Sequence, residues 1–431
     1  MRRFALLVAG LALLAGVAAT VSGGGMQADA RWVISDLGTF GGPESTPMAL
    51  NERGQVVGAA DTKARSGKYR EPIHHAFLWQ GGKMIDLGAQ PGLPQSVAVA
   101  VNDRGQVVVI AQAVDERNYA YPSRAYLLDR GRVTDLGARG KSSVALAINE
   151  RGQIIGCFGS FQDFDYFLPD YFLACYDSGS FLWQNGKRID LGTREVVALN
   201  NRGQVVGQSG NHAFLWQDGT VRDLGTLGGK ESEALTINER GEAVGSAQTK
   251  KINRADDYDD YGSPMRRAFL WANGRMRDLG TFGGPDGEAV AINQRGQVVG
   301  WVDTKNTSAA DRHMGEVCGD GKYSHPAPHA FLWANGRITD LGSLGGLESE
   351  AAAVNDQGQV VGWADTKRRD SEGCAVGHAF VWENGRMTDL GTLPGGKASE
   401  AVAINDRGQI IGWSQTKGGK QHAVLWTLKR G

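Results

Sequence analysis

The amino-acid sequence predicts an all-β protein, an eight-bladed β-propeller of four-stranded antiparallel blades. The first observation is a unit of four short apolar runs that occurs eight times along the 431 residues. The second is that turn residues follow each run. The third is that the repeats begin with the fourth strand of a unit and end with the other three. Four-stranded blades around a central channel explain this pattern.

The unit is clearest between residues 329 and 367, which read HAFLWANGRITDLGSLGGLESEAAAVNDQGQVVGWADTK. Asn335-Gly336 separates the first two apolar runs. This dipeptide favours a type I′ hairpin turn, because both central residues must adopt positive φ. Asp356-Gln357-Gly358 separates the third run from the fourth. We therefore expect two hairpins, or four antiparallel strands, in each unit.

We name the strands of a unit a, b, c and d, beginning with the strand that ends in asparagine. Strand b is the QVVG run, strand c the HAFLW run and strand d the run with Asp-Leu-Gly. The strand-a asparagines are Asn51, Asn102, Asn149, Asn200, Asn238, Asn293, Asn355 and Asn405. The strand-d aspartates are Asp36, Asp86, Asp135, Asp190, Asp223, Asp278, Asp340 and Asp389. Because Asn and Asp hydrogen-bond nearby backbone in turns, we expect these residues to maintain the blades.

The ends of the repeat region predict a closed ring. Residues 32–37 form a lone strand d, whereas residues 400–427 supply strands a, b and c. A linear solenoid would leave both ends incomplete and apolar. In a ring, the first strand completes the last blade. We therefore expect one propeller domain over residues 31–431.

Strand composition agrees with blades packed face to face. Runs such as residues 298–300 and 330–333 are continuously apolar, as expected for strands covered on both faces. Seven of the eleven tryptophans close strand c. Because a buried aromatic ring removes a large apolar area from water, we expect these seven to pack between blades.

Repeated sequence motifs such as HAFLW, DLGTLGG and AINxRGQVVG occur along the chain from about Asp36 to Trp426. The HAF motif lies at residues 75–77, 212–214, 329–331 and 378–380. Through these motifs the chain resembles the HAF-repeat family of predicted bacterial extracellular proteins. The resemblance implies export and a repeated β architecture, and it implies no reaction. Arg124, Ser180 and Arg267 replace the histidine in three copies. We therefore do not expect this histidine to be a shared ligand.

The N-terminus predicts a signal peptide over residues 1–30. Arg2-Arg3 precedes an apolar segment from Phe4 to Ala19, and Ala28-Asp29-Ala30 fits a cleavage site. We expect export to the periplasm or the extracellular space, with no membrane span after cleavage. The alternative is an uncleaved anchor. A net charge of −1 does not suggest a nucleic-acid partner, and we expect a monomer.

Four cysteines in an exported chain predict two disulfides. Cys157 and Cys175 bracket one insertion, and Cys318 and Cys374 occupy matching insertions of adjacent repeats. We expect the pairs 157–175 and 318–374. The alternative is free, buried thiols.

The blades differ mainly between strands b and c. This connection spans about residues 209–211 in one blade and about 306–328 in another. Connections b–c and d–a leave a four-stranded blade on the same face. Loops on a rigid scaffold commonly bind ligands, so we expect the functional face there.

Aromatic residues in these insertions are candidate binding residues for a carbohydrate or a protein partner. The candidates are Phe161, Phe164, Tyr166, Phe167, Tyr171, Phe172, Tyr258 and Tyr323. The alternative for the insertion over residues 157–180 is a loop that folds on itself and caps the ring.

Acidic residues suggest one possible cofactor, Ca²⁺. Glutamates occur five residues before the strand-a asparagine in five consecutive units: Glu195, Glu233, Glu288, Glu350 and Glu400. If strand a is innermost, they surround the channel mouth, where a cation would offset their repulsion. The alternative is that each accepts backbone N–H groups of its own loop. The acidic loop at residues 256–261 is expected to be solvated.

Enzyme motifs such as HExxH, GxSxG and CxxC are absent from the sequence. We therefore expect a secreted binding module that recognises a carbohydrate or protein partner through loops on one face. The second hypothesis is an extracellular carbohydrate-active hydrolase or lyase that uses the same loops, and the third is a structural envelope protein. A cleft with converging carboxylates would favour the enzyme.

Overall fold

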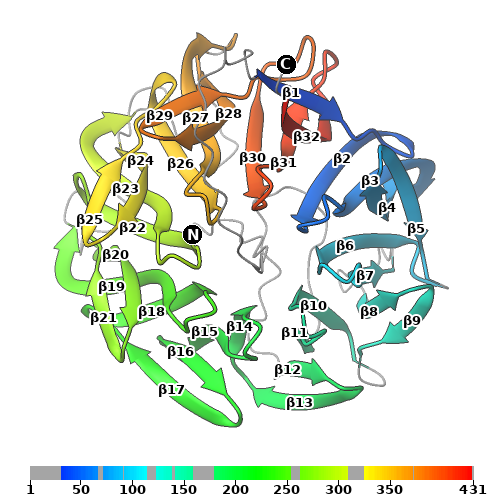
Figure 1. Ribbon diagram of the computed structural model, residues 1–431, viewed down its shortest axis with the longest axis horizontal. Coiled ribbons are helices and arrows are strands. Elements are labelled where there is room, and N and C mark those ends of the chain that lie inside the picture. The colour runs from blue at the N-terminus through cyan, green and yellow to red at the C-terminus, as the bar shows by residue number, and fades with distance from the viewer. Residues whose placement is uncertain are drawn as a thin grey trace, which may run out of the picture.

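The chain folds into a ring of eight antiparallel sheets, as the computed structural model shows (Figure 1). The structure describes residues 31–66, 71–90, 92–113, 123–137, 141–158, 179–253, 263–308, 325–371 and 373–429. No helix in these ranges is long and apolar enough to cross a membrane. Each sheet has four strands, so the predicted eight-bladed β-propeller is confirmed.

The blades are numbered along the chain. Blade 1 contains β2 (Gly41–Leu50), β3 (Val56–Ser66), β4 (Glu71–Gln80) and β5 (Lys83–Gly88). Blade 2 contains β6 (Gln95–Val101), β7 (Val107–Gln112), β8 (Ser123–Asp129) and β9 (Arg132–Asp135). Blade 3 contains β10 (Ser143–Ile148), β11 (Ile154–Phe158), β12 (Gly179–Gln184) and β13 (Lys187–Gly192). Blade 4 contains β14 (Glu195–Leu199), β15 (Val205–Ser209), β16 (His212–Gln217) and β17 (Thr220–Gly225).

The second half continues the pattern. Blade 5 contains β18 (Gly228–Ile237), β19 (Ala243–Asn253), β20 (Ser263–Ala272) and β21 (Arg275–Asp278). Blade 6 contains β22 (Gly283–Ile292), β23 (Val298–Ser308), β24 (His325–Ala334) and β25 (Arg337–Asp340). Blade 7 contains β26 (Gly345–Val354), β27 (Val360–Arg369), β28 (Ala375–Glu383) and β29 (Arg386–Asp389). Blade 8 contains β30 (Ser399–Ile404), β31 (Ile410–Gln415), β32 (Gln421–Lys429) and β1 (Arg31–Asp36).

The first strand closes the ring, as predicted. β1 pairs antiparallel with β32, from Arg31 opposite Lys429 to Asp36 opposite Val424. The Leu37 backbone N–H continues this ladder by donating to the Ala423 carbonyl at 2.9 Å. Figure 1 shows the a strands nearest the centre of the ring, with strand d on the rim of each blade.

The predicted hairpin turns are also confirmed. Asn335 and Gly336, between β24 and β25, have φ of 53° and 82°. The Asn-Gly pairs at residues 185–186, 273–274 and 384–385 likewise have positive φ at both positions. Asn tolerates this conformation and Gly adopts it without steric cost, so the repeated dipeptide fixes the register of strands c and d.

The core lies between neighbouring blades. The phenylalanine of strand c is almost fully buried in six blades, at Phe77, Phe181, Phe214, Phe269, Phe331 and Phe380. The seven tryptophans that close strand c all belong to apolar clusters, as predicted: Trp79, Trp183, Trp216, Trp271, Trp333, Trp382 and Trp426. Burial of this apolar area provides the main driving force for assembly of the ring.

The strand-a asparagines form a closed ring of hydrogen bonds. Each Nδ2 donates to the backbone carbonyl of the asparagine in the next blade, at 2.8 to 3.1 Å, and Asn405 donates back to Asn51. Each Oδ1 also accepts the backbone N–H four residues later in its own chain. The predicted turn function is therefore confirmed, and the same carboxamide also joins adjacent blades.

The residue after each asparagine forms a second closed ring. Its backbone N–H donates to a side-chain oxygen of the equivalent residue in the next blade. These residues are Glu52, Asp103, Glu150, Asn201, Glu239, Gln294, Asp356 and Asp406. Burial and the carboxylates of Asp406 and Asp103 raise the pKa of Glu52 to about 7, against the lowering effect of the hydrogen bond from Asp406 N–H.

At six of the eight junctions between blades, a serine near the start of strand a connects the two blades. Its Oγ accepts the backbone N–H of the strand-c alanine of the preceding blade, as Ser45 does from Ala423 at 2.9 Å. The other five serines are Ser96, Ser143, Ser232, Ser349 and Ser399. These bonds hold the blade edges together at the end opposite the asparagine ring.

The asparagine ring predicts a large effect for Asn200→Ala. Asn200 is fully buried, donates to Asn238 O and Gln204 Oε1, and accepts N–H groups from Arg202 and Gln204. Its removal leaves several buried polar groups without partners, so we expect a loss of roughly 2–4 kcal/mol in the free energy of unfolding. Denaturant unfolding measures this loss.

The matched control is Asn185→Gly in the β12–β13 turn, where φ is 50°. Glycine adopts this conformation readily, so we expect a change within about 0.5 kcal/mol. Equal effects of the two substitutions would show that the asparagine ring does not stabilise the propeller.

Candidate functional site

All eight binding residues predicted from the sequence lie outside the described residues. This holds for Phe161, Phe164, Tyr166, Phe167, Tyr171, Phe172, Tyr258 and Tyr323. Cys157 and Cys374 are both disulfide-bonded. The expected partners, Cys175 and Cys318, also lie outside the described residues, so the pairing remains a prediction.

The strand-a glutamates lie on the inner strands, near the strand start at Glu195 and Glu400 and in the middle of the strand in the other three blades. Glu233 and Glu288 are buried. Burial, followed by the Glu233 and Glu350 carboxylates, raises the pKa of Glu288 to about 8, while Arg266 and a hydrogen bond with Ser246 oppose this rise. Glu288 is therefore mainly protonated at neutral pH, which limits repulsion within the group. Within the described ranges, no three His, Cys, Asp or Glu side chains are grouped to hold a metal ion, and the Ca²⁺ hypothesis remains a prediction.

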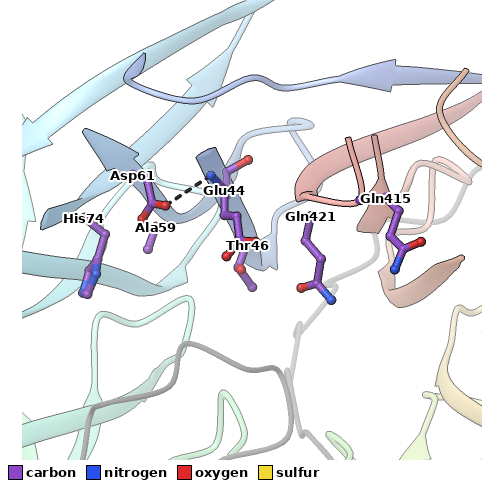
Figure 2. Close-up of a pocket in the computed structure, with 9 residues that line it drawn as sticks. Glu44, Thr46, Ala59, Asp61, His74, Gln415 and Gln421 are labelled. Atoms are coloured by element: carbon purple, nitrogen blue, oxygen red, sulfur yellow. Dashed lines mark hydrogen bonds between the residues drawn. The ribbon is translucent and has the colours of Figure 1, made fainter. Parts of the chain in front are cut away.

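A pocket of about 200 Å³ lies between blades 1 and 8 (Figure 2). Its lining residues are Glu44, Ser45, Thr46, Ala59, Asp61, His74, Gln415, Gly419 and Gln421. Gly419 belongs to the b–c connection of blade 8, and Gln421 begins the strand that follows it. Glu44 lies near the beginning of strand a of blade 1. The pocket therefore opens on the face of the b–c and d–a connections, which the sequence predicts to be functional.

Two glycines shape the blade 1 side of this pocket. Gly41 has a φ of 95°, and a Cβ at Gly42 would lie 2.5 Å from the Thr62 carbonyl oxygen. Only glycine permits strand a to cross so close to the end of strand b. This crossing places the Glu44 backbone N–H 3.2 Å from Asp61 Oδ2, as the dashed line in Figure 2 shows.

The pocket carries two carboxylates and a neutral imidazole. Burial and the Glu44 carboxylate raise the pKa of Asp61 to about 6, although the Glu44 N–H, Arg65 and Lys420 favour its ionised form. Burial, assisted by His75, lowers the pKa of His74 to about 3. At neutral pH the pocket therefore contains negative charge that is partly removed from water and no charged histidine.

The opposite wall is polar and largely uncharged. Figure 2 shows Gln415 and Gln421 across the pocket from Asp61 and His74. Lys420 Nζ lies 3.5 Å from Glu44 Oε1, and both side chains are exposed, so this ion pair contributes little stability. Carboxylate and carboxamide groups on facing walls can bind a ligand rich in hydrogen-bond donors.

The sequence reasoning did not identify the residues of this pocket. Glu44 and Asp61 lie seven residues before and ten residues after Asn51, and the equivalent positions in other blades are also mostly acidic or amide residues. That repetition could be seen in the sequence. The approach of residues 415–421 to blade 1 could not be seen there without the closed ring.

The histidine of the HAF motif pairs with the strand-d aspartate. His75, His212, His329, His378 and His422 place Nδ1 2.8 to 2.9 Å from the aspartate of their own blade. Arg124 forms the equivalent pair with Asp135 at 2.7 Å. Although burial opposes it, the hydrogen bond to Asp340 raises the pKa of His329. These contacts give the histidine a structural role within the blade.

No protein-family model matches the sequence, and no curated protein matches it significantly. Among solved structures, the chain is similar to the β-propeller domain of the Trilobed protease from Pyrococcus furiosus. The identity is 9%, the match covers 90% of this chain and 97% of that one, and the TM-score is 0.43.

Two peptidases show comparable values. An acylaminoacyl peptidase from Pyrococcus horikoshii has 10% identity over 86% of this chain and 57% of its own, with a TM-score of 0.43. A puromycin-hydrolyzing peptidase from Mycobacterium tuberculosis has 10% identity over 86% of this chain and 57% of its own, with a TM-score of 0.40. The chain thus spans less than two thirds of these two peptidases. At these values the similarity gives no information about activity.

The raised pKa of Glu288 predicts a specific pH dependence. The folded state holds a proton on this side chain between pH 4.5 and about 8, whereas the unfolded chain releases it near 4.5. The free energy of unfolding should therefore fall as the pH rises through this window. Glu288→Gln removes this loss of stability. We therefore expect the variant to have a free energy of unfolding roughly 1–3 kcal/mol higher than that of the unchanged protein above pH 8.

Chemical denaturation at several pH values measures this effect. Glu383→Gln, an exposed substitution at the last residue of β28, is the control and should leave the slope unchanged. An unchanged slope in Glu288→Gln as well would show that Glu288 ionises normally.

Proposed function

We propose that the protein is an exported binding module that recognises a carbohydrate or protein partner through the face of its b–c and d–a connections. The pocket between blades 1 and 8 receives a donor-rich polar group of that partner. The observation that supports this most is the partly desolvated Asp61 carboxylate beside Glu44, opposite Gln415 and Gln421. Such acceptors stabilise bound N–H and O–H groups strongly when water is excluded.

The size of the pocket limits what enters it. A volume of about 200 Å³ lies below the range of about 300–1,000 Å³ that is usual for drug-sized ligands. One monosaccharide unit or one long polar side chain fits that space better than an extended oligomer. The rest of a larger partner would lie on the surrounding loops.

A thermal-shift panel on the protein tests this proposal. It contains oligosaccharides, peptidoglycan fragments and short polar peptides. A ligand of the folded state adds about 2.7 kcal/mol at a hundred times its Kd. We expect at least one class to raise the Tm, and we expect Glu44→Gln with Asp61→Asn to abolish the shift.

Glu383→Gln serves as the matched control, because it removes one exposed carboxylate at a c–d turn, on the other face. It should respond to the ligand as the unchanged protein does. If no member of the panel raises the Tm, or if the double substitution leaves the response intact, the pocket is not the binding site.

A second candidate function is a carbohydrate-active hydrolase or lyase. The specific observation is the pKa of Asp61, about 6, which suits a group that exchanges protons near neutral pH. We expect Asp61→Asn to reduce turnover of an oligosaccharide at least a hundredfold while binding persists. Product analysis by mass spectrometry checks this, and intact substrate after prolonged incubation with the unchanged protein contradicts it.

A further inference from the structure

The repeats provide an internal comparison for the pocket. Counted from the strand-a asparagine, Glu44 corresponds to Glu231 of blade 5, and Asp61 corresponds to Gln248. Strand pairing extends the comparison, because His74 lies opposite Asp61 in the same way that Arg266 lies opposite Gln248. Three lining positions of the pocket thus have known equivalents in blade 5.

In blade 5 a guanidinium group occupies this environment. Arg266 Nη1 lies 3.3 Å from Glu231 Oε2, and its Nη2 donates to Ser246 Oγ at 3.1 Å. Ser246 is the equivalent of Ala59, which also lines the pocket in blade 1. Gln248 Nε2 donates to the same carboxylate oxygen at 2.9 Å. The guanidinium therefore lies between the equivalents of two pocket-lining residues.

Blade 1 keeps the glutamate of this site, has Ala59 in place of the serine acceptor, and replaces the cation. His74 takes the position of Arg266, but its side chain is shorter and neutral at pH 7, since burial lowers its pKa. Asp61 adds a carboxylate where blade 5 has the neutral Gln248. The result is more negative charge and an open volume where blade 5 has a guanidinium.

Three basic groups near this volume, in the part of the chain that the structure describes, do not fill it. Lys420 contacts Glu44 from the blade 8 turn, and its side chain is 57% exposed at the rim. Arg65 acts on Asp61 through its charge, and His75 is paired with Asp86. None of these three side chains belongs to the pocket lining.

We propose that the pocket between blades 1 and 8 binds a guanidinium group of the partner, in the place that the Arg266 guanidinium takes in blade 5. This inference rests on the proposed binding function and specifies its ligand. A planar guanidinium presents several N–H donors in a fixed fork, so it can engage Glu44 and Asp61 together, whereas an ammonium group cannot match that geometry. The guanidinium comes either from a free guanidino compound or from an arginine side chain.

Calorimetric titration and thermal shift with four probes test the proposal. The probes are agmatine, acetyl-arginine-methylamide, L-citrulline and cadaverine. We expect the two guanidino probes to bind, and citrulline, a neutral isostere of arginine, to bind at least tenfold more weakly. If agmatine binds more tightly than the capped arginine, the natural ligand is a small molecule. If the capped arginine binds more tightly, the natural ligand is a peptide. Either order supports the guanidinium site.

Two substitutions locate the binding. Glu44→Gln changes an exposed side chain, so we expect the variant to fold normally. Its affinity for agmatine should be at least tenfold weaker. His74→Arg supplies a guanidinium from the chain itself, as in blade 5, so we expect it to lose agmatine binding and to keep or raise the Tm. Glu383→Gln should bind agmatine unchanged.

The outcomes separate this inference from the proposed function. If a sugar or a neutral peptide raises the Tm and the guanidino probes do not, the guanidinium assignment is wrong and the binding function stands. If citrulline binds as well as agmatine, or if a folded His74→Arg protein still binds agmatine, the assignment is likewise wrong. If no probe of any kind binds, both proposals fail.

Discussion

One side chain, the asparagine at the end of strand a, connects local and global structure in this protein. Its Oδ1 fixes the a–b turn of its own blade, and its Nδ2 donates to the next blade. Because the acceptor is the backbone carbonyl of the next asparagine, correct formation of one turn positions the acceptor for its neighbour. Eight such steps return to the starting blade, so the geometry of each turn must be compatible with closure of the whole ring.

This dependence explains why the repeats are so similar near the asparagine, whereas the start of strand a and the end of strand b vary between blades. The a–b turn contributes to closure in every blade, and a change there affects two blades at once. Positions at the start of strand a and the end of strand b contact only the nearest junction. Asp61 at the end of strand b and His74 on the paired strand c differ from Gln248 and Arg266 of blade 5, whereas the glutamate is the same in both blades. This difference leaves a pocket in one blade where another holds an internal ion pair.

The fold could be predicted from the sequence because its determinants are local and repeated. The Asn-Gly turns and the continuous apolar runs follow from residues close in the chain, and the phase of the termini follows from comparing the first repeat strand with the last unit. The pocket was not predicted, because its walls come from residues 44–74 and 415–421 and meet only after closure. The burial that shifts the pKa of Asp61 and His74 is likewise a property of the assembled ring.

The pairing of β1 with β32 has a kinetic consequence. These strands lie at opposite ends of the repeat region, so their pairing carries a large entropic cost of loop closure. We therefore expect it to occur late in folding. The pocket joins residues of blade 1 to the turn that precedes β32. A chain that has not completed its last blade can therefore contain most of the propeller and still lack the pocket, which makes ligand binding a reporter of complete folding.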